Sequence, residues 1–311
     1  MRRYALKYSI VIPVFNEQGN LTALYDRLKK TLDNMGETYE IIFIDDGSSD
    51  NSYQIIKALG NSDRAVKTIR FTRNFGQHPA VIAGLHSAKG QIIITIDADL
   101  QNPPEEIPRL VASMDEGNDI VFGVFKRPEE PAYRRAGSAF AKWILSKMMP
   151  SVPTNLSGFR AIRADVIHQF MQFGEKQVFI DALLCWMGYK IGIVEVERHI
   201  RYSGKSKYNI FKLAGLWLDM VVAFTNLPLR FAMLLGSILG LIGIIMGVIY
   251  LVFYFVYGVL VPGFTTTIIL ITTFAGVQLL CVGIVGEYIG RIDIQMKKRP
   301  DYIIREQSDI D

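Results

Sequence analysis

Short apolar runs alternate with amphipathic stretches along the chain up to residue 125. Five runs have the length of strands: YSIVIPV (8–14), EIIFID (40–45), VKTIRF (66–71), QIIITID (91–97) and DIVFGVF (119–125). Between them, the spacing of apolar residues predicts helices over about 17–34, after GSSDNS, near 78–88 and from Pro104. Strands with apolar side chains on both faces, alternating with helices, are typical of a parallel sheet that is covered by helices on both sides. The pattern therefore predicts an α/β domain of the kind that often binds nucleotides.

Two much longer apolar runs follow near the C-terminus. Neither Phe231 to Val261 nor Phe264 to Gly286 contains a charged residue, and each exceeds the ~20 residues that cross a ~30 Å hydrocarbon core. We expect a transmembrane hairpin; the alternative is a buried helical hairpin of a large soluble protein. The Pro-Gly connection between the two runs carries no charge. The positive residues nearby lie before the first run or after the second: Arg230, Arg291, Lys297, Lys298, Arg299 and Arg305. The positive-inside rule then predicts cytoplasmic ends and an external loop at residues 262–263.

Two segments mix basic residues with Trp, Phe and Leu at helical spacing, as helices on a membrane surface do. They are residues 134–150 and 209–230; for the first, a helix packed on the sheet is an equal alternative. The predicted division is a cytoplasmic domain (1–208), an interfacial helix (209–230), a transmembrane hairpin (231–286) and a cytoplasmic tail (287–311). Small residues in GSILGLIG (236–243) would also permit close helix approach in a homo-oligomer.

Composition supports a membrane protein and excludes several other classes. The chain has 311 residues, of which 50% are hydrophobic and 21% charged, more apolar than one soluble domain of that size requires. Its net charge of +4 is mild and dispersed, which argues against nucleic-acid binding. Cys185 and Cys281 each lie inside an apolar run, so neither a disulfide framework nor a zinc site is indicated. The N-terminus lacks the apolar region of a signal peptide, which predicts a first domain that stays in the cytosol.

Acidic residues end two of the predicted strands. Asp97 and Asp99 in IIITIDADLQNPPEE are two residues apart, so they should project to the same side at the end of the strand. Asp45 and Asp46 in IDDGSSD end another strand. Ligands of open α/β sheets bind outside the carboxyl ends of strands, and paired carboxylates with substrate phosphates suit Mg²⁺ or Mn²⁺. Capping of strands and helices is the alternative, but two acidic ends on one sheet favour a nucleotide-diphosphate and metal site.

Other nucleotide and catalytic motifs are missing from the sequence. There is no GxxxxGK[ST] loop, no GxGxxG after the first strand and no GxSxG nucleophile elbow. The four histidines show no metal-ligand spacing, and only His78, beside a glycine-containing turn, stays open as a functional candidate. P-loop, dinucleotide-binding and serine-hydrolase activities are therefore not indicated.

The order of motifs resembles that of the family-2 glycosyltransferases that load sugars onto polyprenyl phosphate, among them the undecaprenyl-phosphate 4-deoxy-4-formamido-L-arabinose and bactoprenol glucosyl transferases. These motifs are VIPVFNE, IDDGSSDNS, RNFGQHPAVIAGL, DADLQNPPEEIPRL, SGFRAIR, RYSGKSKYN, the two spans and GEYIGRI…KKRPDYII. The resemblance covers nearly the whole chain and implies a GT-A-type fold. It identifies the family more strongly than it identifies the sugar.

The resemblance also implies roles for individual residues. It implies nucleotide binding by Pro13, Phe15, Glu17 and one of Asp45 and Asp46, and metal-diphosphate binding by Asp97 and Asp99, with Gln101 completing the DxDLQ pattern. It implies contacts with the acceptor phosphate by Arg134, Ser138, Arg201, Ser206 and Lys207.

The expected activity is an inverting transfer of a sugar from a nucleotide diphosphate sugar, UDP-linked, to undecaprenyl phosphate at the cytoplasmic face of a bacterial inner membrane. The catalytic residues would be Asp97, Asp99, Arg134 and Arg201. A processive polysaccharide synthase is disfavoured because no QxxRW-type motif is present and two spans make a poor channel. A non-catalytic scaffold or flippase component would leave the acidic strand ends unexplained. Asp181 is interpreted as a helix residue paired with a nearby cation, since a phosphate acceptor needs no general base.

Overall fold

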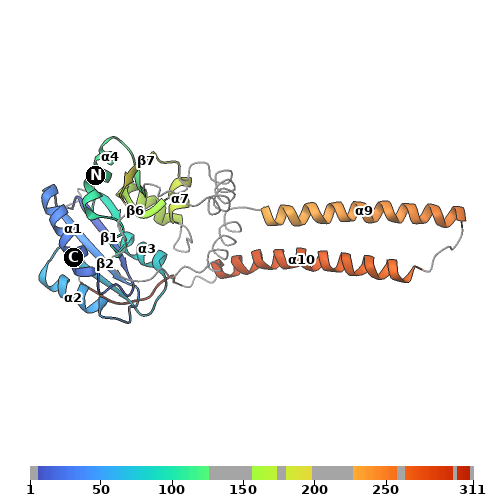
Figure 1. The fold of residues 1–311 in the computed structure, drawn as a ribbon, viewed down its shortest axis with the longest axis horizontal. Coiled ribbons are helices and arrows are strands. Elements are labelled where there is room, and N and C mark those ends of the chain that lie inside the picture. The colour runs from blue at the N-terminus through green and yellow to red at the C-terminus, as the bar shows by residue number, and fades with distance from the viewer. Residues whose placement is uncertain are drawn as a thin grey trace. The chain divides into compact units, whose positions relative to one another are not determined.

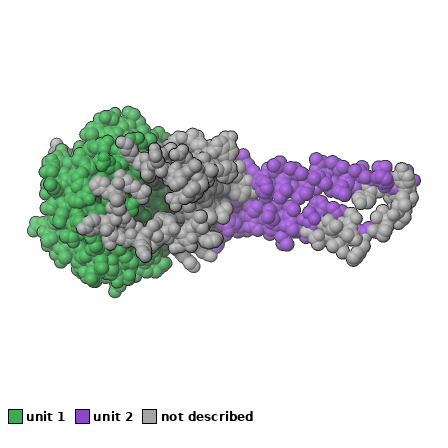
Figure 2. All heavy atoms as spheres, viewed as in Figure 1, with its two compact units in different colours: residues 1–206, 300–311 green, residues 207–299 purple. Residues whose placement is uncertain are grey.

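The computed structural model describes residues 6–125, 156–173, 180–197, 227–257, 263–296 and 300–308. They belong to two compact units (Figures 1 and 2). One comprises residues 1–206 with 300–311, and the other comprises residues 207–299. The first unit contains all of the nucleotide-site residues predicted above, and the second contains both long apolar helices.

The first unit is built on an eight-stranded sheet with the order β7-β5-β6-β4-β1-β2-β3-β8. The strands are β1 (Tyr8–Val14), β2 (Tyr39–Asp45), β3 (Val66–Phe71), β4 (Ile92–Thr95), β5 (Ile120–Phe125), β6 (Leu156–Arg163), β7 (Ile191–Val196) and β8 (Ile304–Gln307). β1 pairs in parallel with both β2 and β4, while β6 and β8 run antiparallel to their neighbours. The predicted mostly parallel sheet is confirmed, and it is a mixed one.

Helices cover both faces of this sheet (Figure 1). One hydrophobic core lies beneath α1 (Leu21–Met35), α2 (Ser52–Ser62) and α4 (Ile107–Asp115), which follows the short 3-10 turn η1 (Pro104–Glu106). The other lies beneath α3 (Gln77–Ser87), α6 (Ala164–Phe170) and α7 (Ile180–Trp186); a second 3-10 turn, η2 (Met171–Phe173), follows α6. Successive strand side chains point to opposite faces, so Ile10 and Ile12 contribute to the first core and Val11 to the second.

The predicted strands and helices up to residue 125 all form, with shifted ends. α1 begins at Leu21 rather than near residue 17 because residues 16–20 form a loop. β4 ends at Thr95 rather than at residue 97, and the chain then turns sharply, with Leu100 in the left-handed region at φ 61°. Asp97 and Asp99 therefore lie in a turn beyond the strand and not within it.

The second unit contains α9 (Leu227–Tyr257) and α10 (Phe264–Met296). Both are long and apolar enough to cross a membrane, in the windows Leu229–Phe253 and Thr273–Gly290. Only 6% and 0% of these windows is buried within the chain, whereas a core helix of a soluble protein would be mostly buried. The helices contact each other where the Cys281 Sγ lies 3.7 Å from the Ala232 carbonyl oxygen.

The structure near the C-terminus has two features that the sequence did not predict. α10 continues to Met296, beyond the expected end of the transmembrane hairpin at residue 286, and residues 304–307 form the edge strand β8 of the first unit's sheet. A four-residue strand of sequence IREQ has no hydrophobic alternation that could announce it. The expected interfacial segments at 134–150 and 209–226 lie outside the described residues, while residues 227–230 belong to α9.

Candidate functional site

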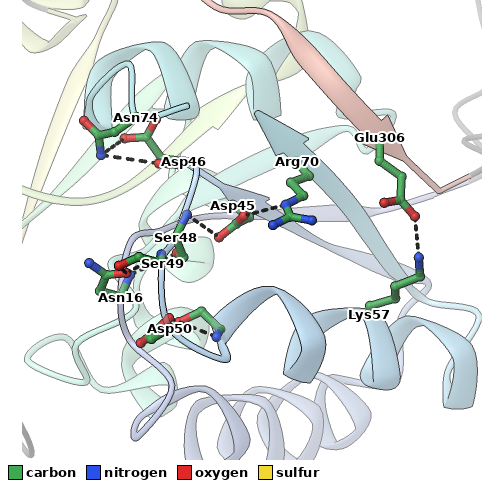
Figure 3. Close-up of polar contacts among 11 residues, drawn as sticks. Asn16, Asp45, Asp46, Ser48, Ser49, Asp50, Lys57, Arg70, Asn74 and Glu306 are labelled. Carbon is green, nitrogen blue, oxygen red and sulfur yellow. Dashed lines mark hydrogen bonds and ion pairs between the residues drawn. The ribbon is translucent and has the colours of Figure 1, made fainter. Parts of the chain in front are cut away.

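The loops that follow β1 and β2 are joined by side-chain to backbone hydrogen bonds (Figure 3). Each loop donates backbone N–H groups to the other: Asn16 N to Ser48 Oγ (3.0 Å), Glu17 N to Ser52 Oγ (2.9 Å), Gln18 N to Asp50 Oδ2 (3.3 Å), Ser49 N to Asn16 Oδ1 (2.9 Å) and Asn51 N to Gln18 Oε1 (3.0 Å). Asn16 adopts a left-handed backbone conformation at φ 57°. Non-glycine residues in such conformations are frequent at functional sites, and here the reciprocal bonds hold the strained residue in place.

Asp45, the last residue of β2, is completely buried. Its Oδ1 accepts a hydrogen bond from Ser48 N at 3.2 Å, and its Oδ2 lies 3.5 Å from the Nε of Arg70 on β3. Burial raises the pKa of Asp45 above its usual value, and the hydrogen bonds from Ser48 and the charge of Arg70 oppose that rise. Arg70 is thus the cation that favours a charged carboxylate at this position.

Asp46 is also buried, and its partners are quite different. Its two carboxylate oxygens accept hydrogen bonds from Phe75 N at 2.7 Å, Gly76 N at 2.9 Å and Asn74 Nδ2 at 2.9 Å. Burial raises the pKa of Asp46, and the bonds from Phe75 and Gly76 lower it. Asp46 therefore fixes the segment that leads into α3.

Asp97 and Asp99, in the turn after β4, are half-buried and accept hydrogen bonds from glutamine side chains. Gln77 Nε2 donates to Asp97 Oδ1 at 2.7 Å, and Gln101 Nε2 donates to Asp99 Oδ2 at 2.7 Å. Gln77 is the first residue of α3. The N-terminal end of α3 consequently links the two acidic loops, since residues 74–76 bind Asp46 and Gln77 binds Asp97.

A buried arginine lies behind the turn. Arg160, on β6 opposite Thr95 of β4, donates from Nε to Thr95 Oγ1 at 3.0 Å and forms an ion pair with Asp181 of α7. Burial lowers the pKa of Arg160 to about 10, and the charge of Asp97 opposes this shift. Burial lowers the pKa of His78, and the charge of the same guanidinium lowers it further. The interpretation of Asp181 as a helix residue paired with a cation is confirmed.

The donor atoms near Asp97 fit a divalent metal that is shared with a substrate. Two carboxylates provide hard oxygen ligands, and Mg²⁺ is typically held by one or two carboxylates together with phosphate oxygens. Among the residues that the structure describes, there is no group of three or more His, Cys, Asp or Glu side chains that could enclose a metal ion. The site thus has the composition expected for a metal that is bound together with a diphosphate.

The structure brings together the predicted residues of the nucleotide and metal site on three neighbouring loops. Pro13, Phe15 and Glu17 lie at the end of β1 or just after it, between the loops of β2 and β4, and Phe15 is 37% exposed. The predicted acceptor residues Arg134, Ser138, Arg201, Ser206 and Lys207 lie outside the described residues.

Sequence reasoning missed four residues: Arg70, Asn74 and Gln77, which contact these acids, and Arg160, whose pKa responds to the charge of Asp97. Asn74, Gln77 and Arg160 lie within the motifs RNFGQHPAVIAGL and SGFRAIR, so the resemblance could have identified them as candidate site residues. Arg70 lies in a strand, where the sequence does not reveal which loop its side chain reaches.

Comparison with known proteins gives consistent matches along the chain. The family model described as glycosyl transferase family 2 matches residues 9–179. A prophage bactoprenol glucosyl transferase homolog of Escherichia coli K12 is 36% identical over 304 residues, covering 96% of this chain and 99% of the relative. The undecaprenyl-phosphate 4-deoxy-4-formamido-L-arabinose transferase of Proteus mirabilis is 36% identical over 312 residues, covering 96% and 93%. A solved glucosyl-3-phosphoglycerate synthase from Mycobacterium tuberculosis matches with a TM-score of 0.49 and 19% identity, over 70% of this chain and 78% of that one.

Proposed function

The chain belongs to glycosyl transferase family 2, and on this premise we propose that it transfers one sugar, with inversion, from a UDP-linked donor to a polyprenyl phosphate. The observation that carries the proposal is the arrangement of acids around β1, with Asp45 and Asp46 after one parallel neighbour and Asp97 and Asp99 after the other. The choice of acceptor is supported by the names of the relatives that match nearly the whole chain, which refer to bactoprenol and undecaprenyl phosphate.

In this proposal, each group of residues has a separate role. Pro13, Phe15, Glu17 and Asp45 bind the base and ribose of the donor, while Asp46 holds the N-terminal end of α3 against the site. Asp97 and Asp99 are the residues that would hold Mg²⁺ or Mn²⁺, whose chemistry here is Lewis-acid stabilisation of the leaving diphosphate.

The acceptor side needs cations rather than a base. A phosphomonoester has a second pKa of about 6 and is largely a dianion at pH 7, so no proton has to leave as the new bond forms. Arg134, Ser138, Arg201, Ser206 and Lys207 would hold this phosphate near the anomeric carbon, where positioning lowers the barrier. Asp181 forms an ion pair with Arg160. This gives Asp181 a structural role and supports a mechanism in which it is not a general base.

The two apolar helices would anchor the enzyme at the level of its lipid substrate. We propose a bacterial inner-membrane protein with α9 and α10 as spans and the catalytic unit on the cytoplasmic face. Their length, apolar character and low burial support this arrangement, as does the placement of positive charge outside the hairpin connection.

Product analysis tests the function directly. Full-length protein in detergent is incubated with Mg²⁺ or Mn²⁺, a panel of nucleotide sugars and undecaprenyl phosphate, and the lipid fraction is analysed by mass spectrometry. We expect a lipid-linked monosaccharide with one sugar of the panel. A polymer would instead support a processive synthase, and the absence of any lipid product across the panel would contradict the proposal.

A further inference from the structure

The C-terminal strand β8 pairs with β3 at the edge of the first unit's sheet, and the tail (residues 300–308) has side-chain contacts on both sides of that edge. Its backbone extends the sheet through Thr72 N to Ile303 O (3.0 Å) and Ser308 N to Thr68 O (2.9 Å), and Glu306 pairs with Arg70 in the register. Adjacent strand residues point to opposite faces, so Arg70 and Phe71 extend from β3 in opposite directions. Arg70 lies between the tail and Asp45, and Phe71 lies between the tail and the loop that binds Asp46.

Aromatic contacts form the connection on the α3 face. The Tyr302 ring stacks on Phe71 with centroids 5.0 Å apart, and Phe71 meets the edge of Phe75 at 5.8 Å. Phe75 donates its backbone N–H to Asp46 at 2.7 Å. Tail, β3 and the Asp46 loop are therefore in continuous contact on this face.

Charged and polar contacts form the connection on the α2 face (Figure 3). Glu306 forms an ion pair with Lys57, whose Nζ lies 5.6 Å from the centroid of the Tyr53 ring. The Arg70 guanidinium lies 4.2 Å from the centroid of the Tyr53 ring, and its Nε lies 3.5 Å from Asp45 Oδ2. Arg70 thus lies between the Tyr53 ring and the buried Asp45 carboxylate, and the Lys57–Glu306 ion pair lies beside the same ring.

We propose that Arg70 is a positioning residue for the donor site and that the C-terminal strand holds it in place through Glu306 and Tyr53. This inference rests on the proposed function, in which Asp45 binds the nucleotide of the donor. Simple protection of a sheet edge would require only backbone pairing, whereas here side chains of the tail contact Phe71 and Lys57, which in turn lie against Phe75 and the Tyr53 ring. The tail, which follows α10 directly in the chain, becomes part of the donor site.

The charge of Arg70 also favours the ionised form of Asp45. The charged and titratable groups that act on Asp45 are Arg70 from β3 and Asp50 from its own loop, with Asp46 adjacent and Tyr53 facing it from α2. Arg70 opposes the rise in the pKa of Asp45 that burial causes. Without this cation the pKa of Asp45 rises further, so the carboxylate is protonated at a higher pH. A residue with a purely structural role would not shift this pH dependence.

The test measures binding of UDP with Mn²⁺ to the full-length protein in detergent by calorimetry. We expect Arg70→Gln to weaken UDP binding about tenfold, Arg70→Lys to recover part of the loss, and Glu306→Gln to weaken it about threefold. The acid limb of UDP binding should move to higher pH in Arg70→Gln. In turnover, the KM for the donor should rise while kcat and the KM for the acceptor stay unchanged.

Arg27→Gln is the matched control, because Arg27, on α1, forms a cross-element ion pair with Glu105. Asp45→Asn tests the underlying assignment: if wild type does not bind UDP, or if Asp45→Asn binds it normally, the donor site itself is wrong. If Asp45→Asn weakens binding while Arg70→Gln and Glu306→Gln both behave like Arg27→Gln, only this inference is overturned. Should Arg70→Gln fail to fold, Glu306→Gln decides, since the Glu306 side chain is 44% exposed and its loss is tolerable.

Discussion

At the scale of single residues, burial separates the acids into two kinds. Asp45 and Asp46 are buried and accept hydrogen bonds largely from the backbone, so their carboxylates are held in fixed orientations. Asp97 and Asp99 are half-buried and accept bonds from Gln77 and Gln101 side chains. A neutral amide side chain can rotate away and be replaced by a cation, so the second pair is better suited to metal exchange.

Asp97→Asn and Asp99→Asn should each abolish sugar transfer while the protein remains folded. Each change removes a carboxylate charge from the proposed metal site and keeps the shape of the side chain. The measurement is the initial rate under limiting metal, with circular dichroism as the check on folding. Asp26→Asn, at an exposed position on α1, is the control, and nearly full activity in either site variant would refute the metal assignment.

Asp181→Asn should reduce stability more than catalysis. The substitution removes the ion-pair partner of the buried Arg160, and we expect the free energy of unfolding to fall by about 1–3 kcal/mol. Turnover should remain within about tenfold of wild type, whereas loss of a general base typically costs about 10²–10⁴-fold. The measurements are chemical unfolding and kcat at a temperature where the variant is folded.

Arg201→Ala provides the comparison for Asp181→Asn, because the proposal gives Arg201 a direct contact with phosphate. It should lower activity more than Asp181→Asn, chiefly through weaker acceptor or diphosphate binding. A thousandfold loss of kcat in folded Asp181→Asn would show that a general base exists and that the proposed mechanism is wrong.

At the scale of elements, α3 is the helix that organises the site. Its N-terminal end links the two acidic loops, and its position depends on the close approach of Gly84 to the sheet. A Cβ atom on Gly84 would lie 2.3 Å from Val11 Cγ1 and 2.8 Å from Ile44 Cδ1. No side chain fits there without displacing the helix or the strands.

Gly84→Ala should therefore destabilise the protein by about 1–3 kcal/mol through overpacking. It should also weaken UDP binding, because moving α3 shifts Gln77 and the residues that bind Asp46. Gly60→Ala is the matched control, since Gly60 is a glycine of α2 whose added Cβ would meet Thr68 at an ordinary 3.4 Å. Thermal unfolding and UDP titration of both variants check this, and equal effects of the two substitutions would contradict the role of Gly84.

The same elements show how far the sequence could predict the fold and the site. Apolar periodicity located β1 to β5 and their helices because those strands are buried on both faces. It did not locate β6, β7 or β8, since strands that join the sheet from far along the chain pair through tertiary contacts and not through local pattern. The acids could be recognised by type and spacing, whereas Arg70 and Arg160 could not, because their importance depends on which carboxylates they reach in the folded sheet.

At the scale of the whole molecule, the C-terminal strand constrains how the chain can cross a membrane. The residues before α9 and those after α10 contribute to one sheet, with β8 paired to β3. A single sheet cannot be divided between the two sides of a bilayer. If α9 and α10 span the membrane, they must therefore cross it an even number of times.

The charge distribution then decides which side carries the sheet. Positive residues flank the hairpin at Arg230 and after Gly286, and the connection between the helices carries none, so the sheet should lie in the cytosol and Gly263 outside.

Cysteine labelling tests this orientation. Single cysteines at Asp26, Gly263 and Ile303, in a background with Cys185→Ala and Cys281→Ala, are treated with a membrane-impermeant maleimide in intact cells. Only Gly263→Cys should react before permeabilisation, while Asp26→Cys on α1 and Ile303→Cys beside β8 should react together afterwards. Reaction of Asp26→Cys and Ile303→Cys but not Gly263→Cys in intact cells would reverse the orientation. If Asp26→Cys and Ile303→Cys reacted on opposite sides, β8 could not pair with β3 in the same chain, and both the even number of crossings and the tail-bound donor site would be wrong.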